Sequence, residues 1–162
     1  MTRRRDIAHF QNPPNAPLPL KGLITRRVAF NEVDPLGIVW HGRYAVFFEH
    51  GAADLERKCG LSYADFLKSG IRAPIVEFHV EYYEPLYLDE EFTIETKIVW
   101  NEAAKITIEY RLVKLSGAIS SSAYTIQLLT YAATGEVCLV PPDMLQQCRE
   151  KWRSGAFAEL QQ

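Results

Sequence analysis

A short stretch in the first third of the 162-residue sequence carries the residues best suited to chemistry. Asp34 opens the loop Asp34-Pro35-Leu36-Gly37, and His41 follows seven residues after Asp34, where a helical pattern begins. A carboxylate can attack an acyl carbon or activate water, and free N–H groups at the start of a helix stabilise developing negative charge. The stretch therefore indicates acyl transfer. The plainer alternative is that Asp34 only closes a turn or caps the helix, because Asp, Pro and Gly favour turns.

A long helix is predicted to follow this loop, from about Arg43 to Lys58. Apolar residues recur there at steps of three and four, which is the period of a helix with one buried face. Further apolar residues beside this stripe indicate that other parts of the fold surround the helix. Gly60 is well suited to end it. The stripe consists of Ala45, Phe48, Ala52, Leu55 and Cys59, widened by Val46 and Phe47.

The rest of the sequence reads mainly as strands. Apolar and polar residues alternate in several segments, which indicates strands with one buried and one solvated face. Residues 119–131 are apolar at both parities, so this strand lies either in the centre of the sheet or against another subunit. A short helix at 63–68 and a C-terminal helix after Pro141 complete an α+β domain, with one long helix on an antiparallel sheet. The alternating segments are 23–30, 74–84, 92–100 and 104–114.

The chain length predicts a single domain with an extension at each end. Residues 1–22 contain four prolines and no apolar period, so we expect a Pro-rich tail that is poorly ordered or lies as a strap over a neighbour. Residues 23–140 form the domain itself. Residues 141–162 form a C-terminal helical extension.

Composition and charge argue against several classes of protein. The sequence has 18 Lys and Arg against 20 Asp and Glu, and this balance argues against a nucleic-acid partner. Three cysteines without a Cys-x-x-Cys pair favour a reducing, cytoplasmic compartment. Residues 115–135 carry no charge, but they are too polar for a membrane span. Closely spaced metal ligands are absent from the sequence, so we expect no metal site.

The loop and the start of the helix share a motif with a known family. The stretch from Asp34 to Glu49 resembles the signature of the hotdog-fold acyl-CoA thioesterases, in particular the 4-hydroxybenzoyl-CoA thioesterase-like group. The order of elements and the later segments 73–76 and 80–92 extend the resemblance to about residues 23–145. The matching motif positions are Asp34, Gly37, Val39, Trp40, His41, Tyr44 and Glu49.

The resemblance implies a fold, an assembly and a substrate. About five antiparallel strands are expected to wrap around one long central helix. Two chains are expected to join their sheets edge to edge, with the active site at the dimer interface, and such dimers often pair into tetramers. The substrate implied is an acyl-CoA. Coenzyme A is then part of the substrate, and no separate cofactor is expected.

The resemblance also implies roles for single residues. Asp34 would attack the thioester carbonyl or activate water, while a backbone N–H near His41 polarises that carbonyl. The His41 ring would orient water or hydrogen-bond the carboxylate, or it has no chemical role. Glu49 would contact the far end of the acyl group or close the pocket, or else pair with an arginine. The residues expected to bind substrate are Gly37, Val39, Trp40, Gly42, Tyr44, Phe48, Glu49 and Val76.

Two questions stay open at the level of sequence. Tyr44 and the preceding Ile38-Val39-Trp40 favour the aryl-CoA branch of the family, whereas His41 favours the short-chain branch. A non-catalytic acyl-CoA sensor and an acyl-thioester dehydratase or hydratase are alternative functions on the same fold. Asp34 argues against the sensor, because a pure binding pocket needs no carboxylate beside the thioester.

Overall fold

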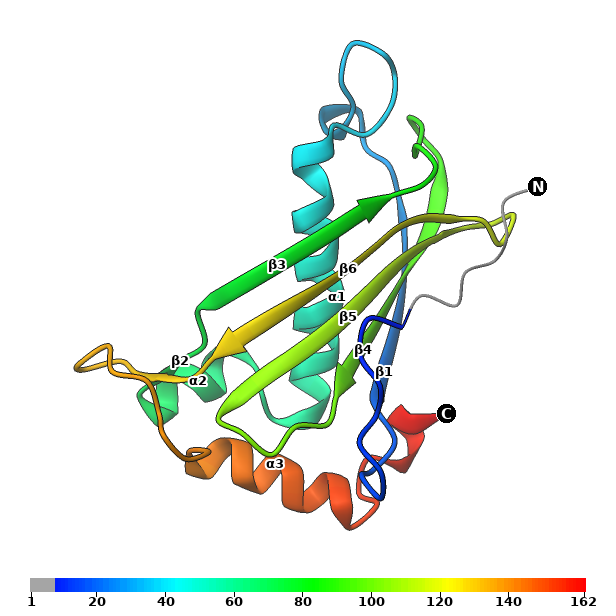
Figure 1. Ribbon diagram of the computed structural model, residues 1–162. Coiled ribbons are helices and arrows are strands. Elements are labelled where there is room, and N and C mark those ends of the chain that lie inside the picture. Colours follow the sequence, from blue (N-terminus) through cyan, green and yellow to red (C-terminus); the bar gives the residue numbers. More distant parts are fainter. Residues whose placement is uncertain (1–7) are drawn as a thin grey trace.

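The computed structural model describes residues 8–162 (Figure 1). Its helices and strands follow the predicted order of strand, long helix and further strands. They are β1 (Leu20–Arg27), α1 (Tyr44–Cys59), α2 (Tyr63–Ser69), β2 (Ile71–Arg72), β3 (Ile75–Tyr82), β4 (Glu91–Val99), β5 (Lys105–Lys114), β6 (Ile119–Leu128), β7 (Thr130–Tyr131) and α3 (Asp143–Arg153), with short 3-10 helices at Phe30–Glu32, His41–Arg43 and Ala158–Gln161.

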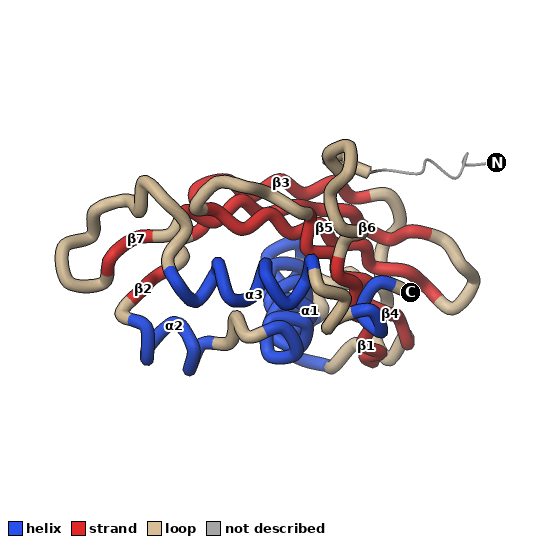
Figure 2. The backbone as a smooth tube through the Cα atoms, turned by 90° about the horizontal axis from the view of Figure 1, so that it is seen from below, coloured by secondary structure: helices blue, strands red, loops and turns tan. Residues whose placement is uncertain are grey.

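The long strands form one antiparallel sheet in the order β1-β4-β5-β6-β3, and β2 pairs with β7 in a small second sheet. The central helix α1 lies against one face of the five-stranded sheet, and α3 crosses one end of the molecule (Figure 2). The expected α+β hotdog arrangement, with five antiparallel strands around one long helix, is confirmed. Because β6 lies between β5 and β3, its apolar character at both parities reflects a central position in the sheet.

The apolar stripe of α1 is turned slightly from its predicted position. Tyr44 is buried, whereas Ala45, which the period placed on the buried face, is exposed. The Tyr44 ring packs edge-on against the ring of Tyr82 in β3, with 4.9 Å between the ring centroids. The aromatic side chain therefore occupies the buried place instead of the methyl group. Gly60 ends the helix with a φ of 80°, a left-handed conformation that favours glycine.

The core lies between α1 and the inner face of the sheet. Alternate side chains of β4 and β5 point toward α1 and are buried, while the charged residues between them pair on the outer face. Nη2 of Arg111 lies 2.6 Å from Oε2 of Glu95, and Lys97 forms an ion pair with Glu109. The core residues of β4 and β5 include Phe92, Ile94, Ile98, Ile106, Ile108, Tyr110 and Leu112.

Residues 8–22 differ from the poorly ordered tail that the prolines suggested. β1 begins at Leu20, three residues before its predicted start. Farther upstream, the Phe10 N–H donates to a Glu109 carboxylate oxygen at 2.7 Å, and the Trp152 indole N–H donates to the Leu18 carbonyl at 2.8 Å. These contacts join segments that are far apart in the sequence, so no local pattern reveals them. Residues 1–7 lie outside the described part of the chain.

The C-terminal helix α3 is fastened to the end of the sheet. The Arg149 guanidinium donates to three backbone carbonyls within residues 102–105, at 2.8 to 3.2 Å. The Trp152 ring packs edge-on against Trp100, with 4.9 Å between ring centroids. These contacts hold α3 in a fixed position relative to β4 and β5.

Gly51 sets how closely α1 approaches β4. A Cβ atom at this position would lie 2.3 Å from Thr96 Oγ1 and 2.7 Å from Ile94 Cγ2. Both neighbours belong to a paired strand in the middle of the fold, so they have little freedom to move away. The helix can reach this depth only because residue 51 has no side chain.

We expect Gly51→Ala to destabilise the protein by about 1–3 kcal/mol, because overpacking outweighs the roughly 1 kcal/mol by which alanine favours a helix over glycine. Urea unfolding measures the difference. Ala45→Gly, an exposed change on the same helix, controls for helix propensity and should cost about 1 kcal/mol. A Gly51→Ala protein more stable than wild type would contradict the close approach.

Candidate active site

Asp34 sits at the start of a tight turn. Val33 and Val39 pair as an isolated antiparallel bridge, and between them the Asp34 carbonyl accepts the Gly37 N–H at 3.0 Å. The Asp34 side chain accepts the Leu36 N–H through Oδ1 at 2.8 Å. Gly37 has a φ of +76°, which explains the glycine at this position. Asp34 therefore does close a turn, but its second carboxylate oxygen, Oδ2, makes no hydrogen bond within residues 8–162.

The turn is fastened to the body of the protein on both sides. The Val39 N–H donates to the Leu86 carbonyl at 2.8 Å, and the Leu88 N–H donates to the Gly37 carbonyl at 3.2 Å. The Trp40 N–H donates to the Glu32 carbonyl at 3.0 Å. The position of Asp34 relative to the start of α1 is therefore set by backbone hydrogen bonds.

An ion pair beneath this loop was missed by sequence reasoning. The Glu32 carboxylate is buried, accepts from Arg26 at 2.6 Å and accepts the Ala29 N–H at 2.8 Å. The Arg26 guanidinium also lies 4.7 Å from the centroid of the Phe47 ring and donates to Nδ1 of His50 at 3.0 Å. The sequence carried a signal for it, because Arg26 breaks the alternation of β1 by occupying an inward position.

The chain enters α1 through the 3-10 helix His41–Arg43. The N–H groups of His41 and Gly42 donate to no acceptor in the part of the chain that the structure describes. The Trp40 ring covers Gly42 so closely that a Cβ atom there would lie 2.3 Å from it, and the Tyr82 hydroxyl donates to the His41 carbonyl at 3.3 Å. Two backbone donors are therefore available beside the Asp34 turn.

The expected substrate-binding residues fall into two groups. The backbone places Gly37, Val39, Trp40 and Gly42 in the same loop as Asp34 and His41. Two further residues, Tyr44 and Phe48, are buried on the first two turns of α1. Phe48 contacts Phe78 of β3 and Tyr110 of β5, with ring centroids 6.2 and 5.1 Å apart. Aromatic rings therefore line this side of the helix.

Val76 and Glu49 lie apart from the other expected substrate-binding residues within a single chain. Val76 is near the start of β3, six residues or about 20 Å of strand before Tyr82, which contacts the His41 turn. A single chain therefore does not bring Val76 to the Asp34 loop. Glu49 is exposed and lies outside the inner face of α1, because the inner positions around it are those of Phe47, Phe48 and Gly51.

The buried acid of α1 is Glu56, which sequence reasoning did not single out. It is 5% exposed, and its carboxyl group makes no hydrogen bond or ion pair with any described residue. Burial, and secondarily the negative charge of Glu49, raise the pKa of Glu56 to about 8. A signal was present in the sequence, because residue 56 lies four positions after Ala52 and beside Leu55 in the apolar stripe.

Glu56 should make stability depend on pH. Its carboxyl group titrates near its ordinary value of 4.5 when the chain is unfolded and near 8 when it is folded. Between these values the folded protein holds a proton that the unfolded chain has released, so stability falls as the pH rises through this window. Glu56→Gln removes this titration and should flatten the fall between pH 5 and 8 by up to about 4 kcal/mol, at about 1.4 kcal/mol per pH unit.

The measurement for Glu56 is the free energy of unfolding in urea at four pH values from 5 to 8. Glu49→Gln serves as the matched control on the same helix, and because Glu49 is exposed this variant should keep most of the wild-type slope. Equal slopes in wild type and Glu56→Gln would show that Glu56 does not titrate in this range.

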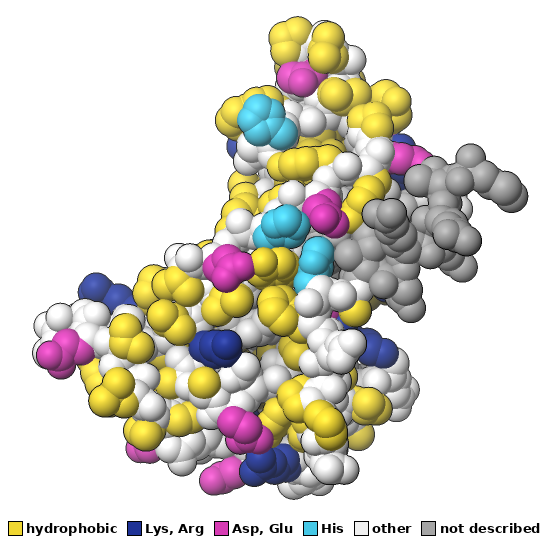
Figure 3. Space-filling view, viewed as in Figure 1, with side chains coloured by type: hydrophobic (Ala, Val, Ile, Leu, Met, Phe, Trp, Pro, Cys, Tyr) yellow, Lys and Arg dark blue, Asp and Glu magenta, His cyan; other side chains and the backbone are white. Residues whose placement is uncertain are grey.

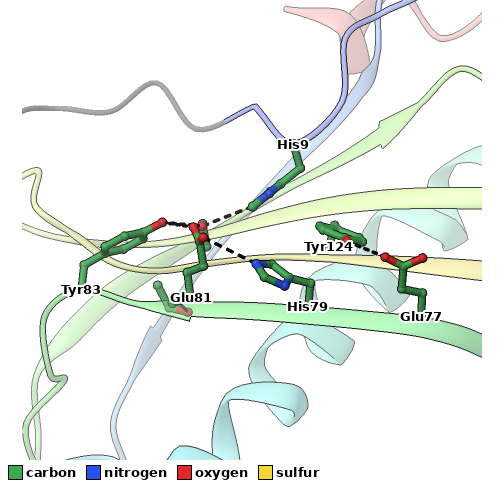
Figure 4. Close-up of polar contacts among 8 residues, drawn as sticks. His9, Glu77, His79, Glu81, Tyr83 and Tyr124 are labelled. Carbon is green, nitrogen blue, oxygen red and sulfur yellow. Dashed lines mark hydrogen bonds and ion pairs between the residues drawn. The ribbon is translucent and has the colours of Figure 1, made fainter.

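A separate polar cluster covers part of the outer face of the sheet. Figure 3 shows two histidines side by side near the middle of this face, with acidic side chains next to them. In Figure 4, His79 lies beside Glu81, and His9 extends across β6 toward them. Nε2 of His79 is 3.6 Å from Oε1 of Glu81. The Tyr83 hydroxyl donates to Glu81 and lowers the pKa of that carboxyl. The cluster shares no residue with the Asp34 loop, and it ties the N-terminal segment to β3 and β6.

No group of three or more His, Cys, Asp or Glu side chains within residues 8–162 is arranged to hold a metal. None of the helices in the same part of the chain is long and apolar enough to span a membrane.

The sequence matches the family model of the thioesterase-like superfamily over residues 28–148. The match covers well over half of the chain, and the chain belongs to this superfamily. It is an enzyme of the thioester hydrolase class, as the resemblance implied.

Individual relatives agree with this class. The chain is 31% identical over 96 residues to the putative acyl-CoA thioesterase YneP of Bacillus subtilis. The matched region covers 59% of this chain and 70% of that protein. The chain is 25% identical over 97 residues to the acyl-CoA thioester hydrolase YbgC of Escherichia coli O157:H7, covering 60% and 72%. The solved structure of the DHNA-CoA thioesterase from Staphylococcus aureus superposes with a TM-score of 0.71 at 23% identity, covering 87% of this chain and 91% of that one, and shares the fold.

Proposed function

We propose that this protein hydrolyses a short-chain or aromatic acyl-CoA to the free acid and coenzyme A, with Asp34 as the catalytic carboxylate. The observation that carries the proposal is the Asp34 turn, which leaves Oδ2 unbonded within the described chain next to two free backbone N–H groups. The similarity to YneP and YbgC, whose names state activity on acyl-CoA thioesters, supports the substrate class.

The reaction proposed uses the two halves of this loop together. Asp34 attacks the thioester carbonyl carbon, or takes a proton from a water molecule that attacks it. The N–H groups of His41 and Gly42 stabilise the negative charge that develops on the carbonyl oxygen. The C–S bond then breaks, coenzyme A leaves as a thiol, and water supplies the new oxygen of the acid. The His41 side chain orients water, and no cofactor beyond the substrate's coenzyme A is required.

The acyl group is proposed to lie along the aromatic side of α1. Tyr44 and Phe48 form one wall with Phe78 and Tyr82 of β3, which suits an aromatic or a short aliphatic acyl group. Glu49, exposed on the same helix, is proposed to close the pocket or to contact a polar end of the acyl group.

The test compares wild type with Asp34→Asn on a panel of aromatic and aliphatic acyl-CoAs, with release of free thiol as the measurement. We expect Asp34→Asn to lose at least about 100-fold in kcat, the range seen for groups that transfer protons or attack, while affinity for the acyl-CoA changes little. Asp89→Asn, a change of an exposed aspartate with positive φ in a nearby loop, serves as the control and should keep wild-type turnover.

Each result of this panel separates the proposal from its rivals. If Asp34→Asn turns over as fast as wild type, Asp34 is not the catalytic group. If neither protein releases thiol but both bind an acyl-CoA, the protein is a sensor.

We propose further that the working unit is a homodimer joined along β3, and that two such dimers pair into a tetramer. β3 is an edge strand of the sheet, and it exposes four large apolar side chains along its length. Hydrophobic side chains are plentiful over the left-hand end of this strand in Figure 3. An open apolar edge pairs readily with another strand. Such a dimer accounts for the exposure of Glu49 and Val76 in one chain. The four exposed β3 residues are Ile75, Val76, Phe78 and Tyr82.

Val76→Lys should separate the chains, because it places a charge in the proposed interface. We expect light scattering after size-exclusion chromatography to give a dimer or tetramer for wild type and a monomer for Val76→Lys. Leu67→Lys introduces the same charge at an exposed site on α2 and should leave the mass unchanged. A monomeric wild-type protein would rule out the assembly while leaving the hydrolase activity to be judged by the acyl-CoA panel.

We also propose a cytoplasmic location. The support is that Cys59, Cys138 and Cys148 are all free thiols.

A further inference from the structure

Two of the three cysteines meet at the end of α1 that is remote from Asp34. Cys59 is the last residue of α1, and Cys148 lies in the middle of α3. The two thiols are close enough to influence each other's titration and line the same cavity, and the Cys59 thiol also donates to the Glu56 carbonyl at 3.6 Å. Both residues are buried, at 1% and 3% exposed. Cys138 is equally buried but has no such partner among the described residues.

Independent contacts hold the two backbones in place. Cys59 is followed by Gly60, whose N–H closes the helix on the Glu56 carbonyl. Cys148 is followed by Arg149, whose guanidinium is fixed by three carbonyls of residues 102–105. The thiols therefore face each other from two anchored elements that are nearly ninety residues apart in the sequence.

The two thiols differ in character. The neighbouring Cys59 thiol lowers the pKa of Cys148, and the positive charges of Arg149 and Lys151 lower it further, against the effect of burial. The neighbouring Cys148 thiol and burial raise the pKa of Cys59. Because the thiolate is the nucleophile in disulfide exchange, Cys148 is the attacking group and Cys59 the resolving one.

A cavity borders this pair. Its volume is about 740 Å³, which falls in the range that accommodates ligands of several hundred daltons. It opens between α2, α3 and the end of α1. Both cysteines line the cavity, together with Lys68, Lys151, Asp65 and Asp143.

We propose that Cys59 and Cys148 form a reversible redox pair that exchanges with low-molecular-weight disulfides such as oxidised glutathione. The Cys148 thiolate attacks one sulfur of the small disulfide, and one small thiol leaves. Cys59 then gives up its proton and attacks Sγ of Cys148, which releases the second small thiol. Two protein thiols are oxidised while one disulfide is reduced to two thiols, so electrons and protons balance.

The product links α3 covalently to the end of the central helix. A bond that closes a loop of this length restricts the unfolded chain strongly, so the oxidised protein should have a Tm higher by about 5 °C or more. Small thiols reverse the bond, so the stability of the protein follows the thiol–disulfide ratio of its surroundings. The redox proposal for this cysteine pair does not depend on the role proposed for Asp34.

The test incubates the folded protein with oxidised glutathione, blocks free thiols with an alkylating reagent and maps the cysteines by mass spectrometry without reduction. We expect a Cys59–Cys148 cross-linked peptide, with Cys138 still a free thiol, and its disappearance on treatment with dithiothreitol. Cys59→Ser should accumulate one glutathione on Cys148, because no second thiol resolves the adduct. Cys148→Ser should take up none at Cys59.

Cys138→Ser is the matched control, and it should form the cross-link and show the rise in Tm as wild type does. The proposal is overturned if wild type shows no cross-link after prolonged incubation, or if glutathione stays on Cys148 with Cys59 present. It is also overturned if Cys138 reacts as fast as Cys148, because the reaction would then reflect general thiol exposure. Since these readouts concern thiols and Tm, loss of hydrolase activity does not affect them.

Discussion

The close contact between α1 and β4 is the constraint on which the rest of the structure depends. Gly51 allows the helix to rest directly on Thr96 and Ile94, where even one methyl group would clash. This depth fixes the helix in the concave face of the sheet and brings the buried rings of Phe47 and Phe48 against the strands. A helix held farther away would leave the core open and its two ends unsupported.

The two ends of the fixed helix carry different chemistry. At its start, backbone hydrogen bonds from Trp40, Val39 and Leu88 hold the Asp34 turn in place. At its end, Cys59 meets Cys148 of α3. The last turn of the helix also contains Glu56, an acid whose pKa burial raises to about 8. A single rigid element thus positions the proposed catalytic loop, a titrating acid and a thiol pair.

The two edge strands of the sheet, β1 and β3, differ in their contacts and in the side chains they expose. β1 at one edge packs against α1 and carries Arg26, whose ion pair with Glu32 precedes the proposed catalytic loop in the chain. β3 at the other edge pairs with β6 on one side only, has no strand on its outer side within the described chain, and exposes large apolar side chains. This asymmetry supports assembly through β3, with a site built from one chain's helix and its partner's edge strand.

Local periodicity was enough to predict the long helix, the five strands and the α+β class, because the 3.6- and 2-residue patterns report directly which face is buried. The Asp-Pro-x-Gly turn and its resemblance to a thioesterase motif could also be recognised from the sequence, because turn chemistry and motif spacing are local. The burial of Glu56 instead of Glu49, the Arg26–Glu32 pair and the contact of Cys59 with Cys148 were not. Each depends on the exact rotation of a helix or on residues distant in sequence, and only packing in three dimensions decides those.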